Sequence, residues 1–211
     1  MDKTDRQYLR MALDESMVDP DPFRQFDIWY DEALNSQEDL PNAFALSTVS
    51  PDGAPSCRIV LLKGVDHGGF TFYTNTLSRK GGHLAKNPMA AICFFWSTLE
   101  RQLRIEGTTQ IVTDDEADAY FATRPRNSQI GAWASPQSEV VKNRQDLDET
   151  FHFRSQELEF VETVPRPPHW TGFRVTPSLF EFWQGRESRM HDRIQYIKKN
   201  DEKWEIQRLA P

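Results

Sequence analysis

The chain has 211 residues, of which 38% are hydrophobic and 27% charged, a composition typical of a soluble globular domain rather than a disordered chain. Its net charge of −7 excludes a general nucleic-acid binder, because a phosphate backbone is bound by an excess of Lys and Arg. Its two cysteines lack metal-ligand spacing, so we expect reduced thiols and no metal site. The sequence has no signal-peptide core and no apolar run long enough to span a membrane. We therefore expect a cytoplasmic protein without a nucleic-acid or membrane partner.

Residues 1–18 are polar with scattered apolar positions and predict an N-terminal arm, frayed or weakly helical, ahead of a single domain over 19–211. Asp21 and Pro22 are typical of a helix start, because Asp caps the first turn and Pro suits the first helical position. Apolar and aromatic side chains recur at helical spacing over 23–34, which predicts an amphipathic helix with its aromatic stripe in the core.

From Ala43 the hydrophobic pattern alternates with a period of two, which predicts strands. Strands are expected at residues 43–49, 56–63, 70–75, 89–97 and 99–112. A turn joins the first two strands as a hairpin, and a short helix over 79–87 starts at Ser78. The strand at 89–97 is nearly all apolar, so we expect it to be central and buried on both faces, and Gly107 predicts a bulge in the next strand.

Thr113 and Glu116 form a capping-box pattern at the start of a helix that ends before Pro125. Two more helices are expected at 128–134 and 139–162, followed by a proline-rich connector. Further strands are expected at residues 170–175, 179–183, 190–197 and 203–209. We therefore predict a mainly β, mostly antiparallel α+β fold, a closed or nearly closed β-barrel with peripheral helices.

Basic residues gather at strand ends and helix starts, whereas the motifs of Rossmann folds, P-loops and serine hydrolases are absent from the sequence. Arg58 and Lys63 stand at the two ends of one apolar strand, five positions apart, so an ideal strand places them on opposite faces. The alternative is that they are surface charges at the ends of a core strand. Ser78, Arg79 and Lys80 stand at a helix start, whose free N–H groups favour phosphate, although a solvated helix start has the same pattern.

A second phosphate site is suggested by Tyr120 and Arg124, which share a predicted helix face, and by Ser128, which heads the next helix. The alternative is a surface turn with one stacked Arg. Taken together, the basic sets suggest two phosphate sites, and hence a phosphorylated cofactor and a phosphorylated substrate.

The stretch from Phe180 to Arg193 passes from an apolar/charged alternation through a loop with Gly185 into Arg-Met-His-Asp-Arg. If this last segment is extended, Arg189, His191 and Arg193 project from one face. Cations so close together repel each other, which favours an anionic ligand among them.

The segments Phe-Glu-Phe-Trp-Gln (180–184) and Arg-Met-His-Asp-Arg (189–193) resemble the signature of the pyridoxamine 5′-phosphate oxidase family, flavin enzymes of vitamin B6 metabolism. The chain also resembles the family, in the family's order, at residues 58–63, 71–75, 78–80, 124–133 and 208–211. The resemblance covers about residues 20–211.

The resemblance implies an FMN-binding split β-barrel and a homodimer with its sites at the subunit interface. It implies oxidation of pyridoxamine 5′-phosphate or pyridoxine 5′-phosphate by molecular oxygen to pyridoxal 5′-phosphate. Hydride would pass from the substrate's 4′ carbon to the flavin, with hydrogen peroxide as a product and ammonia released from the amine.

Carried over by motif, the residues expected to hold FMN are Arg58, Ile59, Val60, Leu61, Leu62, Lys63, Tyr73, Thr74, Arg79, Lys80, Gln102, Gln137, Ser138, Trp183 and Arg193, with Gln137 and Ser138 from the partner subunit. Those expected to hold the phosphorylated B6 vitamer are Lys63, Tyr120, Arg124, Ser128, Arg189, Met190 and His191. Arg189 and His191 are the catalytic candidates. Arg189 would position the ring electrostatically, and His191, which changes charge near neutrality, is either an acid/base group or a supporting hydrogen-bonding residue.

Two other functions remain open: a split-barrel flavin reductase that uses a nicotinamide cofactor, and a module that binds FMN or pyridoxal phosphate without turnover. The predicted phosphate site at Tyr120, Arg124 and Ser128 argues against the reductase. In the family the N-terminal arm often carries adjacent basic residues before a Tyr. Here that piece reads Asp5-Arg6-Gln7-Tyr8, in which Arg6 and Tyr8 could still serve but Asp5 departs from the family's pattern.

Overall fold

The computed structural model describes residues 12–66, 68–200 and 203–211, so most of the predicted arm lies outside the described residues. The helices are α1 (Pro22–Leu34), α2 (Arg79–Lys86), α3 (Asp114–Ala122), α4 (Arg126–Ala134), α5 (Arg144–Glu157) and the short 3₁₀ helix η1 (Glu187–Arg189). The strands are β1 (Ala43–Val49), β2 (Pro55–Leu61), β3 (Gly64–Asp66), β4 (Gly69–Asn75), β5 (Met89–Trp96), β6 (Arg101–Ile111), β7 (Trp170–Gln184), β8 (Asp192–Lys198) and β9 (Trp204–Arg208). None of the described helices is long and apolar enough to cross a membrane.

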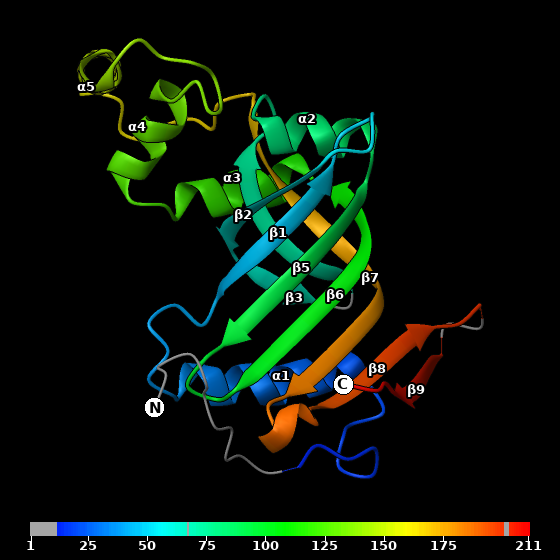
Figure 1. Ribbon diagram of the computed structural model, residues 1–211. Coiled ribbons are helices and arrows are strands. Elements are labelled where there is room, and N and C mark those ends of the chain that lie inside the picture. The colour runs from blue at the N-terminus through cyan, green and yellow to red at the C-terminus, as the bar shows by residue number, and fades with distance from the viewer. Residues whose placement is uncertain (1–11, 67, 201–202) are drawn as a thin grey trace.

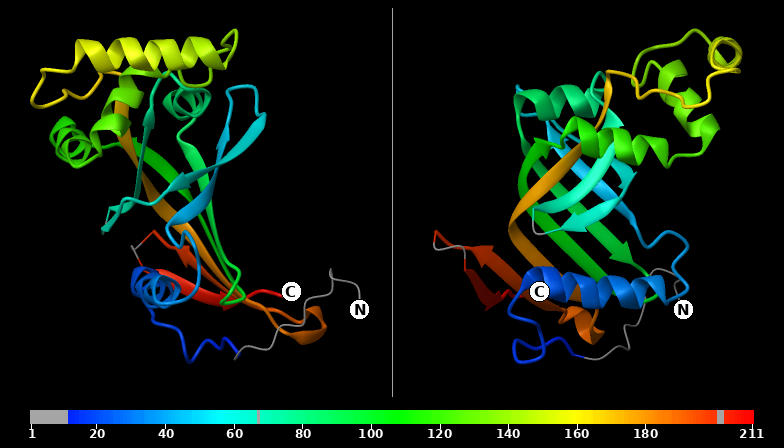
Figure 2. Two further views of the ribbon diagram at one scale, coloured as in Figure 1. Left: turned by 90° about the vertical axis from the view of Figure 1, so that its left-hand side faces the viewer. Right: turned by 180° about the vertical axis from the view of Figure 1, so that it is seen from behind.

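The strands form one curled antiparallel sheet (Figures 1 and 2). Their order is β2-β1-β5-β6-β7-β4-β3, with β8 paired to β7 and β9 paired to β8. In Figure 1, α1 lies at one end of the sheet with β8 and β9, and the helices α2 to α5 gather at the other end. The predicted fold class, mainly β and mostly antiparallel with peripheral helices, is confirmed.

Helix α1 forms where its cap and aromatic spacing predict it. The Asp21 carboxylate accepts a hydrogen bond of 3.0 Å from the Phe23 N–H, which satisfies one of the free donors of the first turn. Phe26 meets Phe70 edge to face at 4.9 Å between ring centroids, and Trp29 meets Phe182 at 5.1 Å. These contacts fix α1 against the enclosed face of the sheet, so the aromatic stripe is core, as predicted.

The predicted burial of β5 on both faces is wrong. Ile92 and Phe94 point into the core, but Met89 and Phe95 on the opposite face are 49% and 55% exposed. A curled sheet encloses only one face, so the apolar side chains of the outer face remain uncovered in a single chain. An uncovered apolar face of this kind is typical of an interaction surface.

The two strands expected at 170–175 and 179–183 are one continuous strand, β7. The register between β6 and β7 shifts between Glu106 and Gly107, which is the predicted bulge. Pro177 pairs with Gly107 beside the bulge, where the N–H that proline lacks is not required. The chain therefore continues past the proline instead of ending there.

The structure differs from the prediction at helix α5, at strand β3 and within residues 12–18. Helix α5 begins only at Arg144, after the Asn143 cap, because Ser138 has a positive φ of 76° and the segment that follows it is not helical. None of the residues of α5 is fully buried, but Leu147 and Phe151 are partly buried, as are Leu158 and Val161 after the helix, and Leu158 packs against the cluster of Phe121, Val164 and Trp170. Strand β3 was not predicted, and within 12–18 the chain forms turns rather than a helix, with Leu13 buried.

Candidate active site

A cleft of about 690 Å³ lies where β2, the end of β4, the start of α2 and the helices α3 and α4 meet. Predicted site residues that line it are Arg58, Ile59, Val60, Leu61, Lys63, Tyr73, Thr74, Lys80, Tyr120, Arg124, Ser128 and Gln137. Strand β2 ends at Leu61, and Leu62 turns into the core. The break brings Arg58 and Lys63 to the same cleft, so the opposite faces expected from an ideal strand are not observed.

The cleft carries positive charge that no acidic side chain compensates. Its described lining includes Arg58, Lys63, Lys80 and Arg124, and contains no Asp or Glu. Burial lowers the pKa of Lys80, and the nearby charge of Arg58 lowers it further. Burial also lowers the pKa of Arg58. Such groups are stabilised by an anion, so the cleft has the electrostatic character of a phosphate site.

Arg124 offers a buried donor without a partner. Its Nη1 atom is buried and makes no hydrogen bond. The guanidinium lies over the Trp170 ring at 4.7 Å and over Phe121 at 5.5 Å, and burial lowers its pKa. An unpaired buried donor is costly, and it belongs to a guanidinium side chain that lines the cleft.

Three parallel aromatic rings form one wall of the cleft. Tyr73 stacks on Tyr120 at 4.0 Å and on Trp170 at 5.1 Å, and Lys63 Nζ lies 5.9 Å from the centre of the Tyr120 ring. Sequence reasoning missed Trp170, which supports both the stack and Arg124. Its only local signal is its position directly after the proline-rich connector, where β7 begins.

The start of α2 contributes Lys80 to the lining of the cleft. Ser78 caps the helix, accepting a hydrogen bond from the Gly81 N–H, and Lys80 Nζ donates to Gln137 Oε1 at 2.8 Å. Thr74 Oγ1 donates to the same oxygen at 3.3 Å. Gln137 thus lies in the cleft of its own chain. Arg79 and Ser138 are exposed and do not line it.

A second group of predicted residues lies on the outer face of the sheet. Gln102, Trp183 and Arg193 are consecutive partners across β6, β7 and β8. Phe95 of β5, which was not among the predicted residues, pairs with Gln102, so the four side chains form one row. Arg193 Nε donates to the buried Glu181 carboxylate at 2.9 Å, and this hydrogen bond raises the pKa of Arg193.

The segment after β7 is a bent loop rather than an extended strand. Ser188 and Arg189 have positive φ values of 56° and 60°, and η1 occupies this turn. Arg189 therefore does not share a strand face with Arg193, and the predicted common face is wrong. The bend occurs after Gly185, between β7 and β8.

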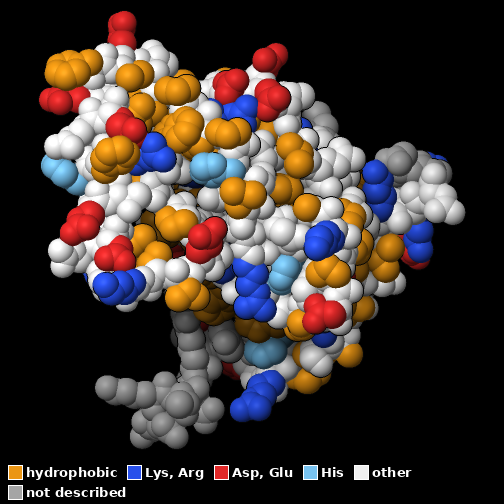
Figure 3. Space-filling model, turned by 90° about the horizontal axis from the view of Figure 1, so that it is seen from above, with side chains coloured by type: hydrophobic (Ala, Val, Ile, Leu, Met, Phe, Trp, Pro, Cys, Tyr) orange, Lys and Arg blue, Asp and Glu red, His pale blue; other side chains and the backbone are white. Residues whose placement is uncertain are grey.

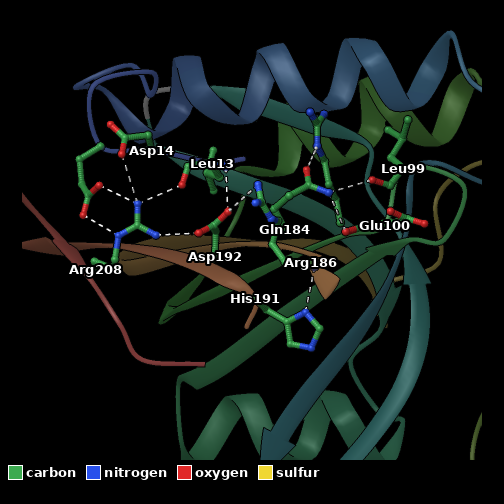
Figure 4. A network of polar contacts seen from close by, with 11 residues as sticks. Leu13, Asp14, Leu99, Glu100, Gln184, Arg186, His191, Asp192 and Arg208 are labelled. Carbon is green, nitrogen blue, oxygen red and sulfur yellow. Dashed lines mark hydrogen bonds and ion pairs between the residues drawn. The ribbon is translucent and has the colours of Figure 1, made fainter. Parts of the chain in front are cut away.

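His191 is held inside this loop (Figure 4). The Arg186 N–H donates to His191 Nδ1 at 3.1 Å, and the imidazole lies against Trp183 at 4.6 Å. Because Nδ1 accepts, the proton of the neutral ring is on Nε2. Burial lowers the pKa of His191, and the Arg189 charge lowers it further. Both effects favour the neutral form of the ring.

The two groups lie at opposite ends of the sheet in one chain. The cleft is at the end with α2, α3 and α4, whereas the loop and Arg193 are at the end with β8 and β9 (Figure 1). Seen from the helical end, hydrophobic side chains are exposed among charged ones (Figure 3), and Val140 and Phe160 are almost fully exposed. No three His, Cys, Asp or Glu side chains gather as a metal site within the described part of the chain.

Two family models match the chain. The model described as pyridoxamine 5′-phosphate oxidase matches residues 30–160, and the model described as pyridoxine 5′-phosphate oxidase C-terminal dimerisation region matches residues 170–211. The curated pyridoxine/pyridoxamine 5′-phosphate oxidase of Cupriavidus taiwanensis is 54% identical, with 98% of this chain and 96% of that protein covered. The protein of the same name from Acaryochloris marina is 52% identical, with 98% and 93% covered.

Solved structures show the same fold. PhzG from Burkholderia lata 383, in complex with tetrahydrophenazine-1-carboxylic acid, matches with a TM-score of 0.89 at 26% identity, covering 98% of this chain and 100% of that chain. A pyridoxamine 5′-phosphate oxidase-related, FMN-binding protein from Nostoc punctiforme matches with a TM-score of 0.71 at 17% identity, covering 95% and 100%.

Proposed function

The chain belongs to the pyridoxamine 5′-phosphate oxidase family of oxidoreductases, and we propose that it uses FMN and molecular oxygen to convert pyridoxamine or pyridoxine 5′-phosphate into pyridoxal 5′-phosphate. The observation that carries this proposal is the cleft with four basic side chains, no carboxylate in its described lining, and the unpaired donor of Arg124. Both the cofactor and the substrates carry a phosphate. The names of relatives more than 50% identical support the same activity.

The cleft has two places suited to a phosphate. Arg58, Lys80 and the start of α2 form one, which fits the FMN phosphate. Lys63, Tyr120, Arg124 and Ser128 form the other, which fits the phosphate of the substrate. In this assignment Ile59, Val60 and Leu61 supply an apolar wall next to the flavin.

The separation of the predicted residues supports a homodimer with a shared site. Arg189, Met190 and His191 lie at the far end of the sheet from the cleft of their own chain. A second copy packed against the exposed row at Phe95 would bring these residues, with Trp183 and Arg193, to that cleft. The dimerisation-region match over 170–211 agrees with this arrangement.

When bound, FMN would supply the redox chemistry, namely hydride transfer from the substrate's 4′ carbon and reoxidation by oxygen to give hydrogen peroxide. Arg124 and Lys63 grip the substrate phosphate and fix the distance of that carbon from the cofactor. Arg189 favours negative charge on the substrate ring. His191 presents Nε2–H, because its Nδ1 is engaged by the Arg186 amide, and so acts as a hydrogen-bond donor.

The activity is tested with purified protein and four substrates. Protein with a flavin spectrum should consume oxygen and release peroxide with pyridoxamine or pyridoxine 5′-phosphate, releasing ammonia only from the amine. The unphosphorylated vitamers should react poorly, because the cleft then gains no phosphate contacts. Flavin reduction by a nicotinamide cofactor without vitamer oxidation would instead identify a reductase, and flavin binding without either reaction would identify a binding module.

A further inference from the structure

The loop that carries Arg189 and His191 is fixed at its beginning by the turn between β5 and β6 (Figure 4). The buried Gln184 amide donates to the Glu100 carbonyl at 3.2 Å, and the Gly185 N–H donates to the same carbonyl at 2.8 Å. The first residues of the loop therefore cannot move without breaking backbone contacts to the sheet.

The end of the loop is fixed by one carboxylate, that of Asp192. Its Oδ2 accepts a hydrogen bond of 3.0 Å from the Leu13 N–H, and its Oδ1 accepts one of 2.8 Å from Arg208 Nη1. Arg186 Nη1 lies 3.7 Å from Oδ2 across the base of the loop. Asp192 thus joins the loop to a segment near the N-terminus and to the last strand (Figure 4).

Arg208 closes the other side of this connection. It donates to both carboxylate oxygens of Glu15, at 2.9 and 2.7 Å, and to the Leu13 carbonyl at 3.0 Å. The hydrogen bonds that Arg208 donates to Glu15 raise the pKa of Arg208. One planar guanidinium therefore binds Glu15, Leu13 and Asp192 at once, which a lysine ammonium would not match.

The loop between these two anchors is strained. Ser188 and Arg189 are consecutive non-glycine residues in the left-handed region. Such conformations persist only where the surroundings impose them. On the C-terminal side of the loop, the contacts that hold Ser188 and Arg189 in this conformation are those made by the Asp192 carboxylate.

We propose that Asp192 is a positioning residue for the reaction: with Arg208 and residues 13–15 it clamps the loop so that Arg189 and His191 reach the substrate. The inference rests on the proposed function. In the clamped loop the Arg186 N–H engages His191 Nδ1, which fixes the ring against Trp183. Loss of the clamp should free the loop without touching the cleft that grips the phosphate.

The charged groups that surround the loop come from several elements. They are Arg186, Glu187 and Arg189 of the loop itself, Asp14 and Glu15 near the N-terminus, Glu100 and Arg101 at the start of β6, and Asp192 and Arg208 of the clamp.

Replacing Asp192 by a neutral residue removes a negative charge, and this alone would lower the pKa of His191. Release of the loop has the opposite effect, because the ring gains water and loses the amide donor to Nδ1. The sign of the shift therefore separates the two effects.

The test uses the full-length, FMN-loaded protein with ¹³C-labelled histidine. The chain has five histidines, and His191→Asn assigns the His191 resonance in an NMR titration. Asp192→Ala removes the clamp, and Asp192→Asn keeps an acceptor for the Leu13 N–H and serves as the milder variant if the first does not fold. Glu205→Gln is the matched control, because Glu205 pairs with Lys199 in the same β8–β9 hairpin away from the loop.

We expect Asp192→Ala to raise the pKa of His191 toward the ordinary value of about 6.5. kcat should fall by about tenfold or more, whereas KM for pyridoxamine 5′-phosphate should change by less than about threefold. Glu205→Gln should match the wild type in both measurements. A lowered or unchanged His191 pKa, or kinetics equal to those of Glu205→Gln, would overturn the proposal. If the wild type has no oxidase activity, the proposed function fails, and the sign of the titration still decides whether Asp192 clamps the loop.

Discussion

Arg124 shows how a single side chain prepares the cleft for an anion. Its guanidinium lies over the Trp170 ring, 4.7 Å from the ring centre, while Nη1 remains buried without a partner. Phosphate contacts of this kind are nearly the same in the ground state and in the transition state. They should therefore determine how tightly the substrate binds rather than how fast it reacts.

Arg124→Ala should raise KM for pyridoxamine 5′-phosphate by about 10- to 100-fold and lower kcat by much less, since a charge-assisted hydrogen bond contributes about 1.5–3 kcal/mol. Steady-state kinetics against the same substrate measure both constants. Arg124→Lys keeps the charge but loses the planar donor, so its KM should lie between those of Ala and wild type. An equal loss in kcat would contradict the assignment of Arg124 to the phosphate.

His191 provides a prediction about pH. Its pKa is lowered by burial and by Arg189, so the neutral ring persists to a pH below that of an ordinary histidine, and kcat should fall only when the pH drops through this lowered value. Asn keeps an acceptor for the Arg186 N–H and a donor in place of Nε2–H. His191→Asn should therefore remove the acidic limb of the kcat profile while costing less than about tenfold at neutral pH.

A different result for His191→Asn would identify His191 as an acid/base group. A loss of about 100-fold or more at every pH in His191→Asn would show that the ring transfers a proton and does not merely donate a hydrogen bond. His191→Leu, which has neither donor nor acceptor, is the control for removing the polar group altogether.

Helix α2 has a low helix propensity, but its first turn packs closely against the end of β4. The two consecutive glycines Gly81 and Gly82 lower its helix propensity, yet only one is required by packing. A Cβ atom at Gly81 would lie 2.3 Å from the Thr76 carbonyl oxygen, whereas one at Gly82 would meet nothing within 4 Å. The close approach of Thr76 holds the start of the helix against the end of β4, where Lys80 enters the cleft.

The two glycines therefore form a matched pair of variants. Gly82→Ala should stabilise the protein by up to about 1 kcal/mol, because alanine restricts the unfolded chain and favours helix. Gly81→Ala should destabilise it by about 1–3 kcal/mol, because the backbone must shift to relieve the contact. Urea unfolding at one protein concentration and one FMN concentration compares them. Equal effects at the two positions would contradict the packing argument.

The elements that local chemistry specifies were predicted well from sequence. The Asp21 cap, the Thr113–Glu116 capping box and the bulge at Gly107 each depend on residues close in the chain or on one backbone requirement. The extent of α5 was not, because apolar spacing does not show where a helix begins, and here the helix starts only after Ser138, which has a positive φ, and the Asn143 cap. The single strand β7 was missed because Pro177 is tolerated only through its pairing with the bulge in β6.

The arrangement of the candidate site is a property of the whole molecule, and sequence patterns predicted it only in part. The cleft residues were identified from basic positions and family motifs, but their common placement depends on the end of β2 at Leu61. The bend at Ser188 and Arg189 depends on contacts with residues far away in the sequence, including Leu13 and Arg208, so no local sequence pattern predicts it. Trp170 was missed for the same reason, since its partner Arg124 comes from a different element.

The outer face of the sheet leads to a prediction about assembly. Phe95 is 55% exposed and stands in one row with Gln102, Trp183 and Arg193, which the family resemblance assigns to FMN. If a second copy covers this row, a charge at Phe95 would be buried without a partner, and burying an unpaired charge is costly. Phe95→Glu should therefore weaken the dimer and FMN binding together.

Sedimentation velocity and FMN fluorescence titration measure the two effects on the same samples. Wild-type protein should sediment as a dimer of 24.6 kDa chains, and Phe95→Glu should shift toward the monomer with at least about a tenfold weaker FMN affinity. Ile28→Glu is the control, because Ile28 is 48% exposed on α1 and lies outside the row. A Phe95→Glu protein that remains dimeric and binds FMN as tightly as the Ile28 variant would rule out this face as the dimer interface. The approach of Arg189 and His191 to the cleft would then require a different surface.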